Sequence, residues 1–253
     1  MKSKNIQFQG SSGFNLSARI DLPDSETAKA FVLFAHCFTC SKNLNAVGHI
    51  SRALTEKDIG VFRFDFTGLG QSGGDFADST FSTDVQDLVA AAGYMKEHHQ
   101  PPAILMGHSL GGAAVLQAAH HIEPVKAVAT IGAPCNPQHV EHLLSEKKDE
   151  IEEKGEATVI LAGRSFKIRK QFLDDLGAQV MDEVIRNLGK ALLIFHSPVD
   201  QTVSIDNAAH IYKLAKHPKS FVSLDDADHL LSNENDARYA GNVTAAWAER
   251  YFT

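Results

Sequence analysis

A serine in a glycine-rich turn is the residue whose surroundings most clearly indicate chemistry. Residues 107–112 read Gly-His-Ser-Leu-Gly-Gly, follow the apolar run 103–106 and open an alanine-rich segment, 113–121. A strand that turns sharply into a helix with serine at the apex matches the nucleophile-elbow pattern G-x-S-x-G. Glycines permit such a turn where a side chain would clash. The pattern predicts Ser109 as a nucleophile, with the amide of Leu110 at a helix N-terminus directed at an oxyanion.

A nucleophilic serine needs partners, and the chain offers them in a consistent order. A serine hydroxyl attacks poorly unless a base takes its proton, and that base needs a carboxylate to orient it. Asp200 follows the apolar run 191–196, and His229 follows the next strand-like segment, 220–224. Because both come just past expected strands, as Ser109 does, we expect the three side chains to meet as a catalytic triad. The other candidates for the acid, all close to His229 in sequence, are Asp225, Asp226 and Asp228.

The chain has 13 histidines, so one histidine alone is weak evidence for catalysis. His36, His108 and His196 also end strand-like runs. We expect these three to pack or to form hydrogen bonds around the site rather than to act as the base. The pairs at 98–99 and 120–121 fall where exposed helix ends are expected.

The loop after the apolar run 29–36 is expected to supply a second oxyanion donor. Residues 36–39 read His-Cys-Phe-Thr. In a site built on a nucleophile elbow, the second amide comes from the loop after a neighbouring strand. We predict Phe38 as that donor, with Cys37 beside it. Losing one such donor costs about 3 kcal/mol of transition-state stabilisation.

The cysteines are sparse and odd in number: Cys37, Cys40 and Cys135. Such a set favours a reducing compartment, and we expect a cytoplasmic protein. Cys37 and Cys40 match C-x-x-C, the spacing of a thioredoxin-type redox pair, but this motif alone is a weak signal. We therefore do not assign a redox role to the two residues from this motif, and the sequence leaves any other role open. A zinc site would need a second pair of ligands, which Cys135 does not supply, so we predict no metal.

Strand and helix patterns alternate along the chain and predict a single α/β domain over residues 1–253. Apolar runs typical of strands buried on both faces lie at 29–36, 61–66, 103–106, 125–131 and 191–196, with a last strand at 220–224. Helices are expected at 41–57 (with Ser41 as the cap), 81–98, 113–121, 206–216 and 238–251. Helices between buried strands predict a mostly parallel, doubly wound sheet with its sites at the carboxyl ends of the strands. Segments 6–9 and 14–22 predict an N-terminal antiparallel hairpin.

Residues from about 133 to 189 interrupt this alternation. The insertion contains a charge-rich segment, 141–156, that predicts a solvated helix, then a small hairpin (158–162 with 166–168) and helical spacing over 171–188. It is too long for a simple connection and predicts a lid; the alternative is an extra helical layer that does not gate the site. Its basic residues suit either an anionic substrate or a solvated basic face, and they are Arg164, Lys167, Arg169 and Lys170.

Composition sets the broad class. The chain has 253 residues, 43% of them hydrophobic and 22% charged, as expected of a globular protein with a sizeable core. Its net charge of −7 gives no support for nucleic-acid binding. No apolar run approaches the roughly 20 residues that span a bilayer, and the lysines near Met1 precede no apolar signal segment. We expect neither nucleic acid nor membrane as a partner, and composition leaves the oligomeric state open.

A second glycine pattern, at Gly68, Gly70 and Gly73, matches the G-x-G-x-x-G fingerprint of dinucleotide sites. That fingerprint requires a helix to begin among the glycines. Here the following residues, 74–78, read as loop. We therefore predict no nicotinamide or flavin cofactor.

Along almost its whole length the chain resembles an α/β-hydrolase-fold serine esterase. The resemblance rests on four motifs: the GHSLGG elbow, the DFTGLGQS loop from Asp65, the HSPVDQTV acid loop and the DADH histidine loop. It is narrower with a bacterial group that occurs alone or fused to an OsmC-type peroxide-reductase domain, through FAHCFTCSK, RFDFTGLGQS and KSFVSLDDADHLL. The 253 residues leave no room for that second domain. Cinnamoyl and feruloyl esterases with an HGFT loop are similar in layout, with glycine where this chain has Cys37.

The resemblance implies an α/β-hydrolase fold and hydrolysis of a small-molecule carboxylic ester through an acyl-enzyme, without a cofactor. In this reading Ser109 attacks, His229 carries the proton, Asp200 orients the imidazole, and the amides of Leu110 and Phe38 hold the oxyanion. The same residues could run thioester hydrolysis, acyl transfer or peptide cleavage. A further alternative is a catalytically weak partner of an OsmC-type peroxide-handling protein, with Cys37 and Cys40 as its redox pair.

Overall fold

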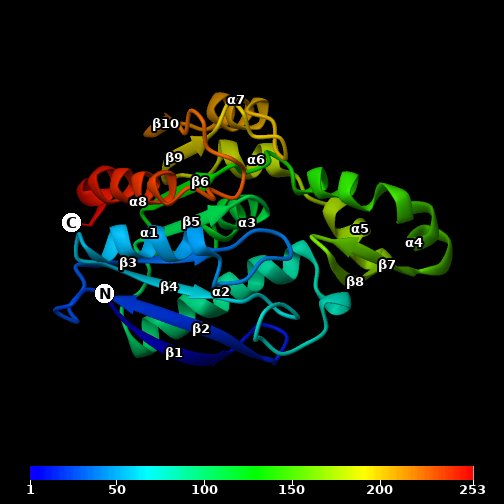
Figure 1. Ribbon diagram of the computed structural model, residues 1–253, viewed down its shortest axis with the longest axis horizontal. Helices are drawn as coiled ribbons and strands as arrows, with labels where there is room; N and C mark the ends of the chain where they lie inside the picture. The colour runs from blue at the N-terminus through cyan, green and yellow to red at the C-terminus, as the bar shows by residue number, and fades with distance from the viewer. Residues whose placement is uncertain (253) are drawn as a thin grey trace.

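A large twisted sheet forms the centre of the molecule (Figure 1), described here over residues 1–252 in a computed structural model. Its strands are β1 (Lys2–Gln9), β2 (Asn15–Leu22), β3 (Ala30–Ala35), β4 (Ile59–Phe64), β5 (Ile104–His108), β6 (Ala127–Ile131), β9 (Ala191–His196) and β10 (Lys219–Ser223). The eight strands lie in the order β1-β2-β4-β3-β5-β6-β9-β10. β1 pairs antiparallel with β2, and β2 pairs antiparallel with β4. The remaining pairs are parallel.

This topology confirms the expected fold class, an α/β-hydrolase fold with an antiparallel hairpin at its N-terminal edge. The central strands β3, β5, β6 and β9 are buried at every position, which explains their continuous apolar sequences. Each parallel step crosses over through a helix, so the carboxyl ends of the parallel strands share one edge of the sheet.

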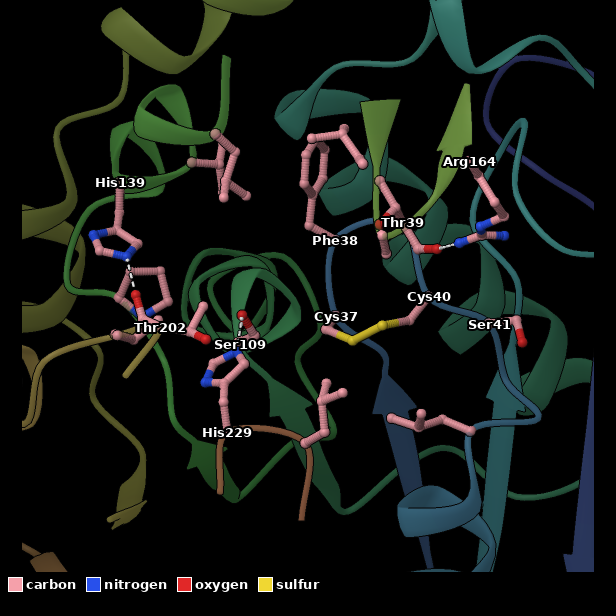
Figure 2. Close-up of a pocket in the computed structure, with 18 of the residues that line it drawn as sticks. Cys37, Phe38, Thr39, Cys40, Ser41, Ser109, His139, Arg164, Thr202 and His229 are labelled. Carbon is pink, nitrogen blue, oxygen red and sulfur yellow. Dashed lines mark hydrogen bonds between the residues drawn. A yellow bond between two sulfur atoms is a disulfide. The ribbon is translucent and has the colours of Figure 1, made fainter. Parts of the chain in front are cut away.

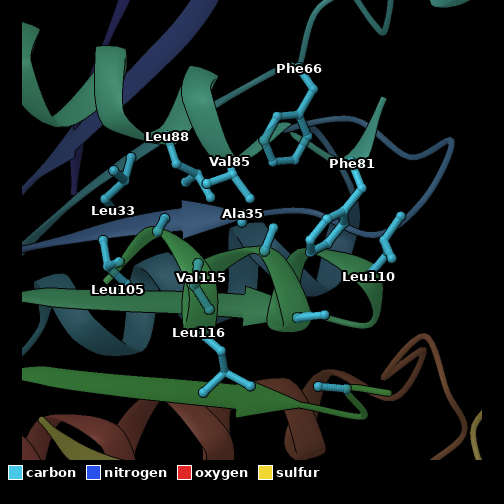
Figure 3. Close-up of a cluster of buried hydrophobic side chains, with 14 of the residues drawn as sticks. Leu33, Ala35, Phe66, Phe81, Val85, Leu88, Leu105, Leu110, Val115 and Leu116 are labelled. Carbon is cyan, nitrogen blue, oxygen red and sulfur yellow. The ribbon is translucent and has the colours of Figure 1, made fainter. Parts of the chain in front are cut away.

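Helices cover both faces of the sheet. On one face, α1 (Asn45–Thr55) packs against α8 (Glu234–Ala248), and Val47 and Ile50 meet the sheet there. On the other face lie α2 (Phe81–His98), α3 (Leu110–Ala118) and α7 (Asp206–Leu214). Figure 3 shows Leu88 of α2 near Leu33 of β3, and Val85 near Ala35, in this second core. The predicted helical spacing in 81–98 thus corresponds to a real buried face.

Two helices begin four residues away from the position expected from the sequence. The helix predicted from Ser41 begins only at Asn45, after the turn in which the Leu44 amide donates to the Ser41 carbonyl. The chain must first complete the loop that follows β3. At the other end of the chain, α8 already begins at Glu234, because the side chain of Asn233 accepts a hydrogen bond from the amide of Asn235 and caps it.

Most of the insertion lies beside the carboxyl edge of the sheet, and its last helix packs against α3 and α7 (Figure 1). Its elements are a 3₁₀ helix (Pro137–Lys147), α4 (Lys148–Lys154), β7 (Glu156–Leu161), β8 (Arg164–Arg169), α5 (Lys170–Gly177) and α6 (Met181–Arg186). β7 and β8 form the predicted hairpin, closed by Ala162 and Gly163. Both turn residues have positive φ, as a type I′ hairpin turn requires.

The single helices expected over 141–156 and 171–188 are wrong. The first region is divided among the 3₁₀ helix, α4 and the start of β7. The second breaks between α5 and α6. Val180, which the helical spacing assigned to the buried face, is 61% exposed at this break, because α5 packs on α2 while α6 packs on α3.

The glycine pattern at 68–73 belongs to a loop, as expected. After Gly73 the chain continues as loop to a short 3₁₀ helix at Phe76–Asp78, and α2 starts at Phe81. Gly70 has a φ of +56°, and a Cβ there would lie 2.3 Å from the carboxylate of Asp65. The glycine therefore serves a close turn around a buried acid. Within residues 1–252, no helix combines the length and the apolar character needed to cross a membrane.

Candidate active site

The residues predicted for the site converge at the carboxyl edge of the sheet. Ser109 lies between β5 and α3, Phe38 follows β3, Asp200 follows β9 and His229 follows β10. The strand order brings these four strand ends to one side of the molecule. Residues far apart in sequence thus meet because parallel strands end at the same edge.

A continuous line of hydrogen bonds joins the serine, the histidine and the acid. His229 Nδ1 lies 2.7 Å from Asp200 Oδ2, and His229 Nε2 lies 3.0 Å from Ser109 Oγ. A carboxylate only accepts, so the Nδ1–H of His229 donates to Asp200 and leaves Nε2 free to accept the hydroxyl proton of Ser109. This is the arrangement that a general base needs before a serine can attack.

Ser109 occupies a strained backbone position. Its φ is +54°, in a region that side chains other than glycine rarely adopt. The flanking glycines allow close packing: a Cβ on Gly107 would lie 2.2 Å from the Gly111 carbonyl oxygen, and one on Gly111 would lie 2.4 Å from that of His36. The G-x-S-x-G spacing therefore fits α3 tightly between β5 and the end of β3, with Ser109 at the apex of the turn.

Asp200 is held by its own loop. Its Oδ1 accepts hydrogen bonds from the amides of Thr202 and Val203 at 2.8 and 2.9 Å. Burial alone would raise the pKa of Asp200, but the hydrogen bond from His229 and these amides together lower it below its usual value. The side chain is 2% exposed and stays ionised beside the imidazole. None of the alternative acids (Asp225, Asp226 and Asp228) occupies this position against His229 Nδ1.

Two further histidines, His108 and His196, form hydrogen bonds to the loops that carry His229 and Asp200, as expected. The Nε2–H of His108 donates to the carbonyl oxygen of His229 at 2.6 Å. The Nε2–H of His196 donates to the carbonyl oxygen of Val203 at 2.8 Å. Burial lowers the pKa of both rings, that of His108 to about 3, so both remain neutral and act as fixed donors.

The loop predicted to supply the second oxyanion donor is fixed by the third histidine. His36 donates its Nδ1–H to the Cys37 carbonyl oxygen at 2.9 Å, and the Cys40 amide donates to the same oxygen at 3.1 Å. In a trans peptide the N–H points opposite to the C=O, so these bonds turn the Phe38 N–H the other way. Within residues 1–252, neither the Phe38 nor the Leu110 amide donates to another protein group. Both amides are therefore available to an oxyanion.

Cys37 and Cys40, whose role the sequence left open, form a disulfide. Proximity in the folded loop, rather than sequence spacing alone, decides this pairing. Between the two cysteines, the Phe38 ring stacks on Phe172 of α5 at 5.6 Å and contacts Phe76 at 5.7 Å. Thr39 has a φ of +59°, and its carbonyl oxygen accepts a hydrogen bond from Arg164 of β8. The insertion thus directly contacts the loop that follows β3.

A cavity of about 550 Å³ opens beside Ser109 (Figure 2). One wall is the loop with the disulfide, and another is the insertion, which contributes His139, Leu143 and Arg164. Its apolar lining residues are Phe38, Leu44, Pro134, Val140, Leu143, Leu161, Ala162, Val203 and Leu230. A site of this size and lining can hold a small organic molecule against the serine hydroxyl.

A buried ion pair that sequence reasoning missed supports the same loop. Lys42 Nζ lies 2.6 Å from Asp65 Oδ2, and the Lys42 amide donates to Asp65 Oδ1. Lys42 also contacts Gln71 at 3.1 Å. Lys42 and Asp65 lie in the FTCSK and DFTGLGQS segments, but nothing in these segments predicts that the two side chains pair. Among residues 1–252, no group of three or more histidine, cysteine or acidic side chains is arranged to hold a metal ion.

Comparison with known proteins places the chain among hydrolases. A family model for serine aminopeptidase, S33, matches residues 26–148. The crystal structure of the esterase domain from a Rhodothermus marinus protein is 50% identical, covers 100% of both chains and superposes with a TM-score of 0.82. Est1E from Butyrivibrio proteoclasticus, solved with ferulic acid bound, is 19% identical, covers 96% of this chain and 98% of its own, and has a TM-score of 0.79. YfhR of Escherichia coli, an uncharacterized protein, is 20% identical over 90% of this chain and 74% of its own length.

Proposed function

Since the chain belongs to the α/β-hydrolase family of esterase-type hydrolases, we propose that it cleaves carboxylic esters through an acyl-enzyme on Ser109. The observation that carries this proposal is the line of hydrogen bonds from Asp200 through His229 to Ser109. A serine hydroxyl with a free base at 3.0 Å and an ionised acid behind that base is poised for nucleophilic attack.

In the proposed acylation step, Ser109 Oγ attacks the ester carbonyl carbon while His229 Nε2 takes the hydroxyl proton. The carbonyl oxygen becomes an oxyanion and accepts hydrogen bonds from the amides of Phe38 and Leu110. The tetrahedral intermediate then expels the alcohol, which receives the proton from His229. Asp200 stabilises the imidazolium while it carries that proton.

The same groups carry out deacylation, with water as the nucleophile and Ser109 as the leaving group. His229 removes a proton from a water molecule, which attacks the acyl carbon, and the proton then returns to Ser109 Oγ as the carboxylic acid leaves. No step needs a metal or an organic cofactor. An ester needs only modest leaving-group assistance, and the apolar cavity beside Ser109 accepts its hydrocarbon parts.

A fluorophosphonate probe tests the assignment of the nucleophile. We expect the wild-type protein to be labelled, Ser109→Ala to remain unlabelled, and Ser25→Ala, a change at an exposed serine of the β2–β3 connection, to label like the wild type. Equal labelling of wild type and Ser109→Ala would reject the proposal. A series of p-nitrophenyl esters of increasing acyl length then measures the size of the acyl pocket.

A second candidate function is favoured by the Cys37–Cys40 disulfide. In this alternative, the protein is a partner of an OsmC-type peroxide-handling protein. The reduced pair would give two electrons and two protons to a disulfide of that partner and close its own disulfide. Thiol titration in air and after treatment with a dithiol tests it; cysteines that remain free thiols in air would remove its support.

A further inference from the structure

We propose that Arg164 selects esters that carry a carboxylate remote from the scissile bond. This inference rests on the proposed ester hydrolysis and adds a substrate class to it. The sequence offers four basic residues on β8 and at the start of α5 as candidates for such a role: Arg164, Lys167, Arg169 and Lys170. The fold separates one of them from the others.

Three of the four basic residues already have acidic partners. Lys167 Nζ lies 2.9 Å from Glu156, and Lys170 Nζ lies 2.6 Å from Asp174. Arg169 pairs with Asp78 and with Glu156. These three charges are paired with carboxylates on the solvent-exposed side of the insertion. They therefore fit the solvated face that the sequence offered as the alternative to a site for an anionic substrate.

Arg164 differs in both partner and position. Among the described residues, it makes no ion pair with a carboxylate, and it lines the cavity that contains Ser109. No aspartate or glutamate of the described chain lines that cavity, whereas His139, His142 and His229 do. In a chain with a net charge of −7, a cavity whose lining includes a cation and no acid attracts an anionic group.

The guanidinium is also held in place before any ligand binds. One nitrogen donates to the Thr39 carbonyl oxygen, and the group lies 5.2 Å from the centre of the Phe166 ring. Arginine has five N–H donors in a planar fork, so the bond to Thr39 leaves donors for a carboxylate. A fixed guanidinium loses little side-chain entropy when it binds an anion.

The position of Arg164 sets where the carboxylate must lie on the substrate. Figure 2 shows Arg164 and Ser41 on one side of the Cys37–Cys40 disulfide, with Ser109 and His229 on the other. A group that contacts Arg164 therefore cannot be the ester carbonyl under attack. It must be the far end of the acyl or the alcohol part, separated from the ester by a spacer that passes the apolar wall of the disulfide and Phe38.

Matched pairs of charged and neutral esters test this inference. One set is the mono-p-nitrophenyl esters of succinate, glutarate, adipate and suberate, each against its methyl-capped diester. The other is 4-acetoxybenzoate against methyl 4-acetoxybenzoate, which places the carboxylate on the leaving group. The measured quantity is the ratio of kcat/KM for the charged ester to that for its neutral partner, in wild type, Arg164→Gln, Arg164→Lys and Lys167→Gln. Glutamine keeps a donor for Thr39, and Lys167→Gln removes a charge from the same strand outside the cavity.

We expect at least one charged ester to be preferred, and Arg164→Gln to lower its ratio by about fivefold or more, mainly through KM. Arg164→Lys should retain part of the preference, and Lys167→Gln should retain all of it. Raising the salt concentration should weaken the wild-type preference. A ratio that is the same in wild type and Arg164→Gln would overturn the inference, including the case in which both esters slow equally because the loop has moved. If Ser109-dependent hydrolysis of every ester is absent, the proposed function fails, and this inference fails with it.

Discussion

Lys42 Nζ and Asp65 Oδ2 lie 2.6 Å apart, with the two side chains 2% and 0% exposed. The same carboxylate accepts the amides of Lys42 and Gln71, so it joins the end of the loop after β3 to the glycine loop after β4. Burying two charges is costly, and each charge depends on its partner. The ion pair therefore fixes the base of the loop that carries Phe38.

Replacing Lys42 by methionine should be strongly destabilising. Lys42→Met leaves the Asp65 carboxylate buried without its cation, and we expect a loss of about 3–5 kcal/mol in the free energy of unfolding. Urea denaturation measures it. Lys57→Met, at an exposed lysine just after α1, is the control and should change stability by less than about 0.5 kcal/mol. Similar stabilities of the two variants would contradict the role of the ion pair.

Opening the disulfide should affect catalysis as well as stability. Cys40→Ser removes the covalent closure of the loop that holds the Phe38 amide. Because one oxyanion donor contributes about 3 kcal/mol and other contacts still restrain the loop, we expect kcat for a p-nitrophenyl ester to fall about tenfold. Cys135→Ser, at the free cysteine, is the control and should keep the wild-type kcat. An undiminished kcat in Cys40→Ser would mean that His36 and Phe172 suffice to hold the loop.

Asp200→Asn tests the identity of the acid. An asparagine amide at this position favours the wrong tautomer of His229, with the proton on Nε2, and we expect kcat to fall about 10⁴-fold with the fold unchanged by circular dichroism. Asp225→Asn, at an exposed acid near His229, should change kcat by less than about tenfold. If Asp225→Asn lost activity and Asp200→Asn kept it, the acid that orients His229 would instead be Asp225, in the loop that carries His229.

The buried neutral state of His108 should appear in the pH dependence of stability. Burial lowers its pKa from 6.5 to about 3, so below pH 6.5 the unfolded chain takes up a proton that the folded chain does not. The contribution of neutral His108 to the free energy of unfolding is therefore complete above pH 6.5. This contribution falls by about 1.4 kcal/mol per pH unit as the pH drops towards 3. His108→Gln keeps a donor for the His229 carbonyl oxygen and should lose less stability between pH 7 and pH 5 than the wild type, as measured by thermal unfolding.

An exposed histidine provides the control for this pH experiment. His98→Gln, at the end of α2, should leave the pH dependence of the melting temperature at its wild-type slope. If His108→Gln retains the full wild-type slope, the acid sensitivity must come from the other buried histidines, His36 and His196.

The sequence alone determined the sheet and the strand ends, because these follow from local patterns. Runs such as Ala191–His196 are apolar on both faces, which is possible only for a strand covered on both sides. The elbow at Ser109 could be predicted from sequence because the backbone packs so closely at Gly107 and Gly111 that only glycine fits at these two positions. Once the parallel order was inferred, the positions of Asp200 and His229 after their strands predicted their meeting with Ser109.

Only the tertiary structure decided how the insertion and the loop after β3 meet. Helical spacing over 171–188 could not reveal that α5 packs on α2 while α6 packs on α3, because it carries no information about the neighbouring elements. Nor could the four basic residues of the insertion be ranked from sequence. Whether a charge such as that of Arg164 or Lys167 is neutralised depends on carboxylates brought near by the fold, and the pairings of Lys42 and of Cys37 depend on the fold in the same way.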